Sequence, residues 1–165
     1  MPDGLTHASA SIIISWCPWM LLFASKTSPM IPAVTIESVT LLSAGALAGV
    51  IISPDLDVAG RTYGKAILWR SSCLVGALWV MLWWPYSQLV EHRSILSHWP
   101  IIGTIIRVGY MISVPLLVWT LLASALNWPP PTATPVMSWL LHQGRWCLIG
   151  LAISDIAHWA MDELF

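Results

Sequence analysis

Side chains that can bind a metal ion are concentrated in four short stretches of an apolar chain of 165 residues. The stretches are "TH" near the start, "SPDLD", "EHRSILSH", and "SDIAHWAMD" near the end. Only 9% of the residues are charged, yet these stretches hold five of the eight acidic residues and four of the five histidines. Ionisable groups in an apolar environment are costly unless they are paired, coordinated or exposed. Their concentration therefore indicates a functional site.

Two of the stretches have carboxylate spacings suited to a divalent ion. Asp55 and Asp57 alternate, so in an extended or turn conformation both carboxylates can meet one cation, although a solvated turn gives the same pattern. His158 and Asp162 are four residues apart, a spacing at which one helix presents an imidazole and a carboxylate to the same metal. Asp155 precedes His158 by three residues and falls on the same helix face.

The remaining histidines are less specific when each is taken alone. His92 and His98 are six residues apart and do not stack on one helix face, so we expect them in a loop that enters a helix near Pro100. A plain polar loop gives the same pattern, and His7 alone is typical of an interfacial or capping residue. Only the joint placement of the four stretches favours a shared metal site. We interpret His142 as structural, and the three cysteines, Cys17, Cys73 and Cys147, as small apolar packing residues.

The elements that must position these residues belong to a membrane protein. Hydrophobic residues make up 57% of the chain and mean hydropathy is +0.74, so the few charges cannot cover a soluble surface. The twelve tryptophans suit the two interfacial belts of a protein in a lipid bilayer. A net charge of −1 gives no electrostatic case for nucleic acid. We expect one integral-membrane domain over residues 1–165.

Apolar runs and breakers predict an all-α membrane helix bundle of about four crossing helices plus one short re-entrant or interfacial Trp-rich helix. The third run has only 14 residues between Arg70 and Pro85, fewer than the ~20 that a crossing requires. Small residues around Gly45 predict close helix contact in the second run. The four crossing segments are expected at about 6–24, 31–53, 100–127 and 136–161.

This topology places all four polar stretches, and both termini, on one face of the membrane. Most basic residues then lie on that face, namely Arg61, Lys65, Arg70, Arg93 and Arg107, while the opposite loops offer only Lys26. The positive-inside rule therefore predicts a multi-pass protein whose termini and metal site are cytoplasmic.

Two stretches carry a resemblance to known proteins. "LWWPYSQLVEHRSILSHWPIIGTIIRVGY", together with "ISPDLD", resembles a bacterial family of uncharacterised metal-binding membrane proteins. The "TH" stretch and the C-terminal His-Asp helix also match, so the resemblance covers essentially the whole chain. More distantly, the order His, PDxD, HRxxxSH, HxxxD is similar to the inner-membrane metal-dependent hydrolases.

The resemblance implies a set of metal ligands and a chemistry. The implied ligands are His7, Asp55, Asp57, His92, His98, His158 and Asp162. Imidazole and carboxylate ligands suit a divalent metal, with Zn²⁺ expected first and Mn²⁺ or Fe²⁺ as alternatives. A weaker similarity to the helical trinuclear-zinc phospholipases concerns the ligand pattern alone, and we carry no substrate over from it.

Two functions from different classes fit these residues. One is a metal-dependent hydrolase of esters or phosphoesters, with a lipid as a candidate substrate, in which Asp57 or Asp155 serves as general base and Arg93 holds developing negative charge. Asp55 is the other carboxylate of the DxD pair that can act as the base. The alternative is a non-enzymatic protein in which a structural metal supports a scaffold or assembly partner of a membrane complex. A transporter is disfavoured, because the polar groups cluster at one face.

Overall fold

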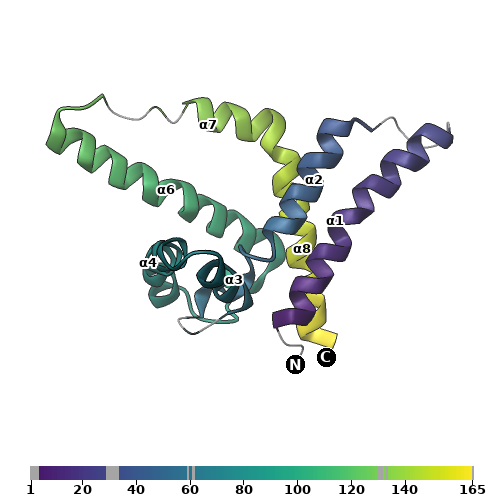
Figure 1. Ribbon diagram of the computed structural model, residues 1–165, viewed down its shortest axis with the longest axis horizontal. Coiled ribbons are helices and arrows are strands. Elements are labelled where there is room, and N and C mark those ends of the chain that lie inside the picture. Colours follow the sequence, from purple (N-terminus) through teal and green to yellow (C-terminus); the bar gives the residue numbers. More distant parts are fainter. Residues whose placement is uncertain are drawn as a thin grey trace.

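The computed structural model describes residues 4–28, 34–58, 60, 62–129, 132 and 134–164. Over these residues the backbone is helical or in turns and connections and forms no strand, which confirms the all-α prediction. Figure 1 shows the long helices spreading apart from one end of the molecule, where the N- and C-terminal ends lie close together. Two positions named above, Arg61 and the expected helix start at residue 31, lie outside the described part of the chain.

Two helices in the described residues are long and apolar enough to cross a bilayer, α1 (Gly4–Thr27) and α6 (Pro100–Leu126). α6 has proline at its first position, where no backbone N–H is needed. Asn127, which follows its last residue, adopts the left-handed conformation (φ 53°) and caps the C-terminus. Its bounds match the predicted segment 100–127. α1 begins near the predicted start and continues through Pro18.

The predicted bundle of four crossings is not shown, because only α1 and α6 among the described helices have the length and composition of a membrane span. α2 (Ile36–Ala48) has 13 residues and covers about 20 Å, against a ~30 Å bilayer core. The Thr35 side chain caps its N-terminus, and turns follow from Gly49. The last segment is divided into α7 (Thr134–Trp139), a π-helical turn η2 (Leu140–Gly144) and α8 (Arg145–Leu164).

The Trp-rich segment differs from its predicted bounds. α4 (Cys73–Leu89) continues through Pro85 instead of ending there. Trp83 and Tyr86, on either side of this proline, are buried against Leu56, and that packing outweighs the lost backbone hydrogen bond. A short helix that we did not predict, α3 (Tyr63–Ser71), precedes α4. Both are seen end-on in Figure 1, so they lie across the direction of α1, α2 and α8.

α2 packs between α1 and α8, and glycines set its distance from α8. A Cβ atom on Gly45 would lie 1.9 Å from the carbonyl oxygen of Cys147. One on Gly150 would lie 2.0 Å from the carbonyl oxygen of Leu42. The close contact predicted for the small residues around Gly45 is therefore confirmed. Of the three cysteines only Cys147 is partly buried at this crossing, whereas Cys17 and Cys73 are exposed.

Candidate metal centre

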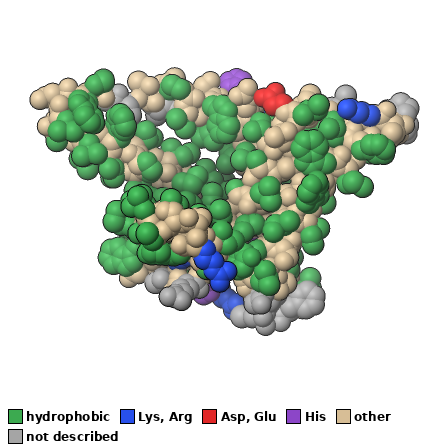
Figure 2. Space-filling model, in the orientation of Figure 1, with side chains coloured by type: hydrophobic (Ala, Val, Ile, Leu, Met, Phe, Trp, Pro, Cys, Tyr) green, Lys and Arg blue, Asp and Glu red, His purple; other side chains and the backbone are tan. Residues whose placement is uncertain are grey.

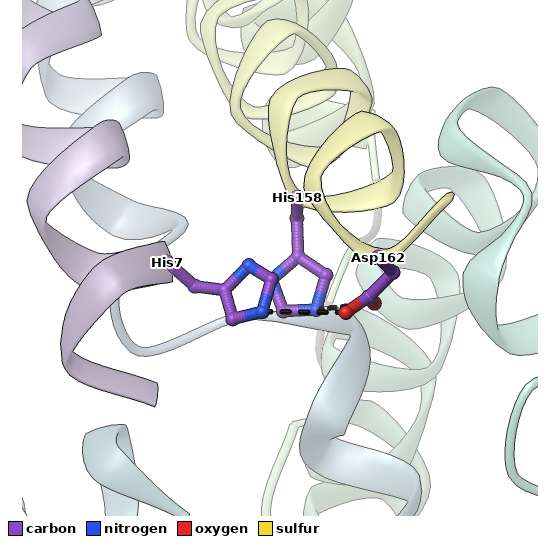
Figure 3. A group of neighbouring side chains, drawn as sticks. All are labelled: His7, His158 and Asp162. Atoms are coloured by element: carbon purple, nitrogen blue, oxygen red, sulfur yellow. Dashed lines mark ion pairs between the residues drawn. The ribbon is translucent and has the colours of Figure 1, made fainter. Parts of the chain in front are cut away.

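The metal-capable side chains lie at the end of the molecule where the helices meet. α1 contributes His7 from its first turns, and α8 contributes His158 and Asp162 from its last turns. Figure 3 shows the two imidazole rings lying one over the other, with centroids 3.8 Å apart, beside the Asp162 carboxylate. His7 Nε2 is 3.3 Å from one oxygen of Asp162, and His158 Nε2 is 3.4 Å from the other.

A 3-10 turn, η1 (Pro54–Asp57), brings two more carboxylates to this end of the molecule. Asp55 Oδ1 lies 3.6 Å from His158 Nε2. Asp57 contacts His92 and His98 instead. The two carboxylates therefore do not share one side as an extended strand would place them, because a 3-10 turn rotates residues two apart by about 240°.

The loop before α6 supplies the last two histidines, as predicted. A single helical turn, α5 (Ile95–His98), ends at His98, and Pro100 then opens α6. His92 Nδ1 lies 2.8 Å from Asp57 Oδ1, and His98 Nδ1 lies 3.5 Å from Asp57 Oδ2. The Asp57 carboxylate is completely buried beneath them.

Each of the seven predicted ligands falls into at least one group able to hold a metal ion. The groups are His7–His158–Asp162, Asp55–His98–His158 and Asp57–His92–His98. Within each group, one ligand atom per residue lies within 4.8 Å of the others. The groups are joined through His158 and His98, so they form one continuous cluster. That these residues bind the ion remains a prediction.

Electrostatics in the cluster favour ionised carboxylates. Burial alone raises the pKa of Asp55, but its close contact with the His158 imidazole and the charges of neighbouring histidines outweigh burial, and the net pKa is lowered. Burial likewise raises the pKa of Asp57, and its contacts with the His98 and His92 imidazoles outweigh burial, so this pKa is also lowered. Both carboxylates are therefore in the form that binds a cation.

The buried polar atoms of the cluster fit a divalent ion. His158 Nε2 is buried and makes no hydrogen bond, although two carboxylates face it. Unsatisfied buried groups are rare in proteins, and a bound cation would satisfy a lone pair and neighbouring negative charges together.

A polar pocket of about 280 Å³ opens beside the cluster. Six of the predicted site residues line it, namely His7, Asp55, His92, Arg93, His98 and Asp162. Arg93 has a positive φ of 62°, a conformation that residues other than glycine rarely adopt and that recurs at functional sites. Thr62 and Tyr63, which the sequence did not nominate, also line the pocket.

Asp155 is placed away from this pocket. Its carboxylate is buried and paired with Arg107 of α6, and it also accepts a hydrogen bond from Thr104. Arg107, which we had placed among the basic residues of the cytoplasmic face, is fully buried and donates to the Ser97 carbonyl oxygen at 2.6 Å. Arg107 and Asp155 each stand out in the sequence as a charged residue inside an apolar segment. Their pairing could not be predicted, because residue spacing carries no information on contacts between residues 48 positions apart.

A family model described as "Uncharacterized metal-binding protein (DUF2227)" matches residues 2–165. No curated protein and no solved structure matches the chain. The family match covers nearly the whole sequence and includes every residue of the cluster. The chain therefore belongs to this metal-binding family.

Proposed function

We propose that this member of a metal-binding family is an integral-membrane, metal-dependent hydrolase of esters or phosphoesters. The observation that carries the proposal is the cluster of four histidines and three aspartates beside a polar pocket. A divalent ion in such a site supplies Lewis acidity and makes water a nucleophile near neutral pH. Zinc suits the mixed nitrogen and oxygen donors, and Mn²⁺ or Fe²⁺ are alternatives.

The membrane setting is supported by the surface of the molecule. Large apolar side chains, including Ile13, Met20 and Leu117, are exposed along the two long apolar helices. Figure 2 shows apolar side chains over much of the visible face, with the charged ones near its upper and lower parts. The crosswise orientation of α3 and α4 suits helices that lie at an interface, as the Trp-rich segment predicted.

Two side chains of the pocket suit the hydrolytic roles. Arg93 lines the pocket, and its guanidinium can bind a phosphate through two parallel hydrogen bonds. A general base must lie within hydrogen-bond reach of the reacting water. Of the three carboxylates that the sequence nominates as base, only Asp55 lines the pocket, whereas Asp57 and Asp155 are buried behind it. We therefore assign the base to Asp55, acting through the carboxylate oxygen that does not bind the ion.

The position of the site at one end of the molecule also bears on the side of the membrane that it faces. Both described ends of the chain lie at the metal-centre end of the molecule, and a substrate in the lipid phase can approach there. By the positive-inside rule we place this end on the cytoplasmic side, because Lys65 and Arg93 lie beside the carboxylates and the pocket.

Elemental analysis and a turnover assay on the purified protein test the proposal. We expect stoichiometric metal and cleavage of at least one lipid or soluble phosphoester, with Arg93→Met lowering turnover more than metal content. Stoichiometric metal without turnover across the panel would favour the alternative, a structural metal in a scaffold protein. A folded chain without metal affinity would refute both functions.

A further inference from the structure

Two histidines of the metal centre direct the same ring nitrogen toward one buried carboxylate. His92 Nδ1 is 2.8 Å from Asp57 Oδ1, and His98 Nδ1 is 3.5 Å from Asp57 Oδ2. An ionised carboxylate only accepts hydrogen bonds. The His92 contact therefore requires a proton on Nδ1, which in neutral imidazole leaves Nε2 with a free lone pair.

Ser97 fixes the same tautomer in His98. The Ser97 hydroxyl lies 3.2 Å from the Ser94 carbonyl oxygen and 3.3 Å from that of Glu91, so its proton has two backbone acceptors. Its lone pair then accepts from His98 Nδ1 at 2.9 Å. Both acceptors near this nitrogen thus favour Nδ1–H.

Asp57 is also separated from the pocket by the rings it contacts. Its carboxylate has no exposed surface, and it is absent from the pocket lining, which includes both His92 and His98. Histidines that bind metals commonly donate their other ring N–H to a carboxylate, which sets the tautomer and orients the ring. His92 and His98 each make a contact of this kind with the Asp57 carboxylate.

We propose that Asp57 is a positioning residue and not a metal ligand. It holds His92 and His98 as Nδ1–H tautomers, so that the Nε2 atoms of both face the ion. The inference rests on the proposed metal centre and reduces its ligands to six, namely His7, Asp55, His92, His98, His158 and Asp162. His7 and His158 already turn Nε2 toward carboxylates, so all four imidazoles bind through the same nitrogen.

Nitrogen NMR of the full chain, labelled with ¹⁵N-histidine and loaded with Zn²⁺, tests the tautomers directly. The chain has only five histidines, so the ring signals can be assigned by single substitutions. We expect a proton on Nδ1 and zinc on Nε2 in both His92 and His98. Zinc bound at Nδ1 of either ring would overturn the inference.

Zinc titrations of two matched variants provide the second test. Asp57→Asn keeps the shape of the side chain but offers a single oxygen acceptor, so we expect unchanged stoichiometry and roughly 10–100-fold weaker zinc binding. Asp55→Asn removes a proposed ligand and should lower stoichiometry or change the coordination sphere seen by X-ray absorption. If Asp57→Asn changes that sphere in the same way, Asp57 is a ligand and the inference fails.

The two proposals fail in different ways. A wild-type chain that binds no zinc would refute the metal centre and this inference together. A wild-type chain that binds zinc, with Asp57 in its coordination sphere, would refute the inference and leave the metal centre intact.

Discussion

At the scale of single residues, the spacing of donor atoms is already close to that around an ion. Metal–ligand bonds of about 2.05 Å in a tetrahedron separate neighbouring donors by about 3.3 Å. The Nε2–oxygen separations at His7, His158, Asp55 and Asp162 are 3.3–3.6 Å. The donor separations are therefore close to those of a bound site, and the stacked rings of His7 and His158 need only turn for both lone pairs to meet at one ion.

His158, like His98, belongs to two of the three ligand groups, so its loss should have a large effect. We expect His158→Ala to remove most bound metal in elemental analysis of the purified protein. His142→Ala is the matched control, because His142 is exposed and its ring contacts only its own helix through the Ser138 carbonyl oxygen. Equal metal content in the two variants would contradict the assignment.

The lowered pKa of Asp57 makes the metal-free protein sensitive to acid. Because the folded-state pKa lies below the ordinary aspartate value of 3.8, ionised Asp57 stabilises the fold above that value. This stabilisation is lost as the pH falls from 3.8 through the lowered pKa. We expect the Tm of the apoprotein to fall more steeply below pH 4 in wild type than in Asp57→Asn. Parallel Tm profiles would show that the carboxylate contributes nothing.

At the scale of elements, a buried ion pair ties α6 to α8 beneath the metal centre. Arg107 joins Asp155 of α8 to the Ser97 carbonyl oxygen, next to His98. Removing one partner of a buried pair leaves an uncompensated charge and costs about 3–5 kcal/mol. Replacing both partners removes that penalty.

We therefore expect Arg107→Met to lower the free energy of unfolding by about 3–5 kcal/mol. The double variant Arg107→Met/Asp155→Leu should lose less than the sum of its single variants. Arg70→Met, at an exposed position, is the control and should stay within about 0.5 kcal/mol of wild type. Denaturant titration in detergent measures these differences, and additive losses would contradict the pairing.

The α2–α8 crossing gives a second prediction at this scale. Gly45→Ala would place a methyl group 1.9 Å from a backbone oxygen of α8, so the helices must separate. We expect a loss of about 1–3 kcal/mol, the usual cost of overpacking. Gly109→Ala is the matched control, because a Cβ there has no neighbour within 4 Å and alanine favours the helix. Similar Tm values for the two variants would contradict the close packing.

At the scale of the whole molecule, the features that could be predicted from the sequence are those that depend on residue type and local periodicity. The sequence predicted the helix at 100–127 and the small-residue contact of α2, because long apolar periodicity and glycine spacing are local signals. It did not predict the continuation of α4 through Pro85, or the separation of Asp55 from Asp57. The first depends on burial of Trp83 and the second on a 3-10 turn, and neither is encoded in spacing alone.

The proposed membrane topology can be tested by labelling. In a variant lacking Cys17, Cys73 and Cys147, single cysteines at Gly60 and Gln88 should both react with impermeant reagents from the cytoplasmic side. A cysteine at Trp128, beyond the far end of α6, should react from the opposite side and serves as the control. Gly60 and Gln88 reacting from opposite sides would exclude an arrangement in which α3 and α4 lie at one interface.

The metal centre draws its residues from both ends of the sequence, which has a consequence for biosynthesis. His7 lies in the first helix and Asp162 in the last, 155 residues later. A ribosome adds about 5–20 residues per second, so roughly 8–30 s separate the synthesis of these two side chains. Throughout that interval the nascent chain carries an incomplete binding site. If these residues bind the ion as proposed, the site is completed only after translation of α8, and a chain that is stalled or cleaved before Asp162 would lack one of its ligands.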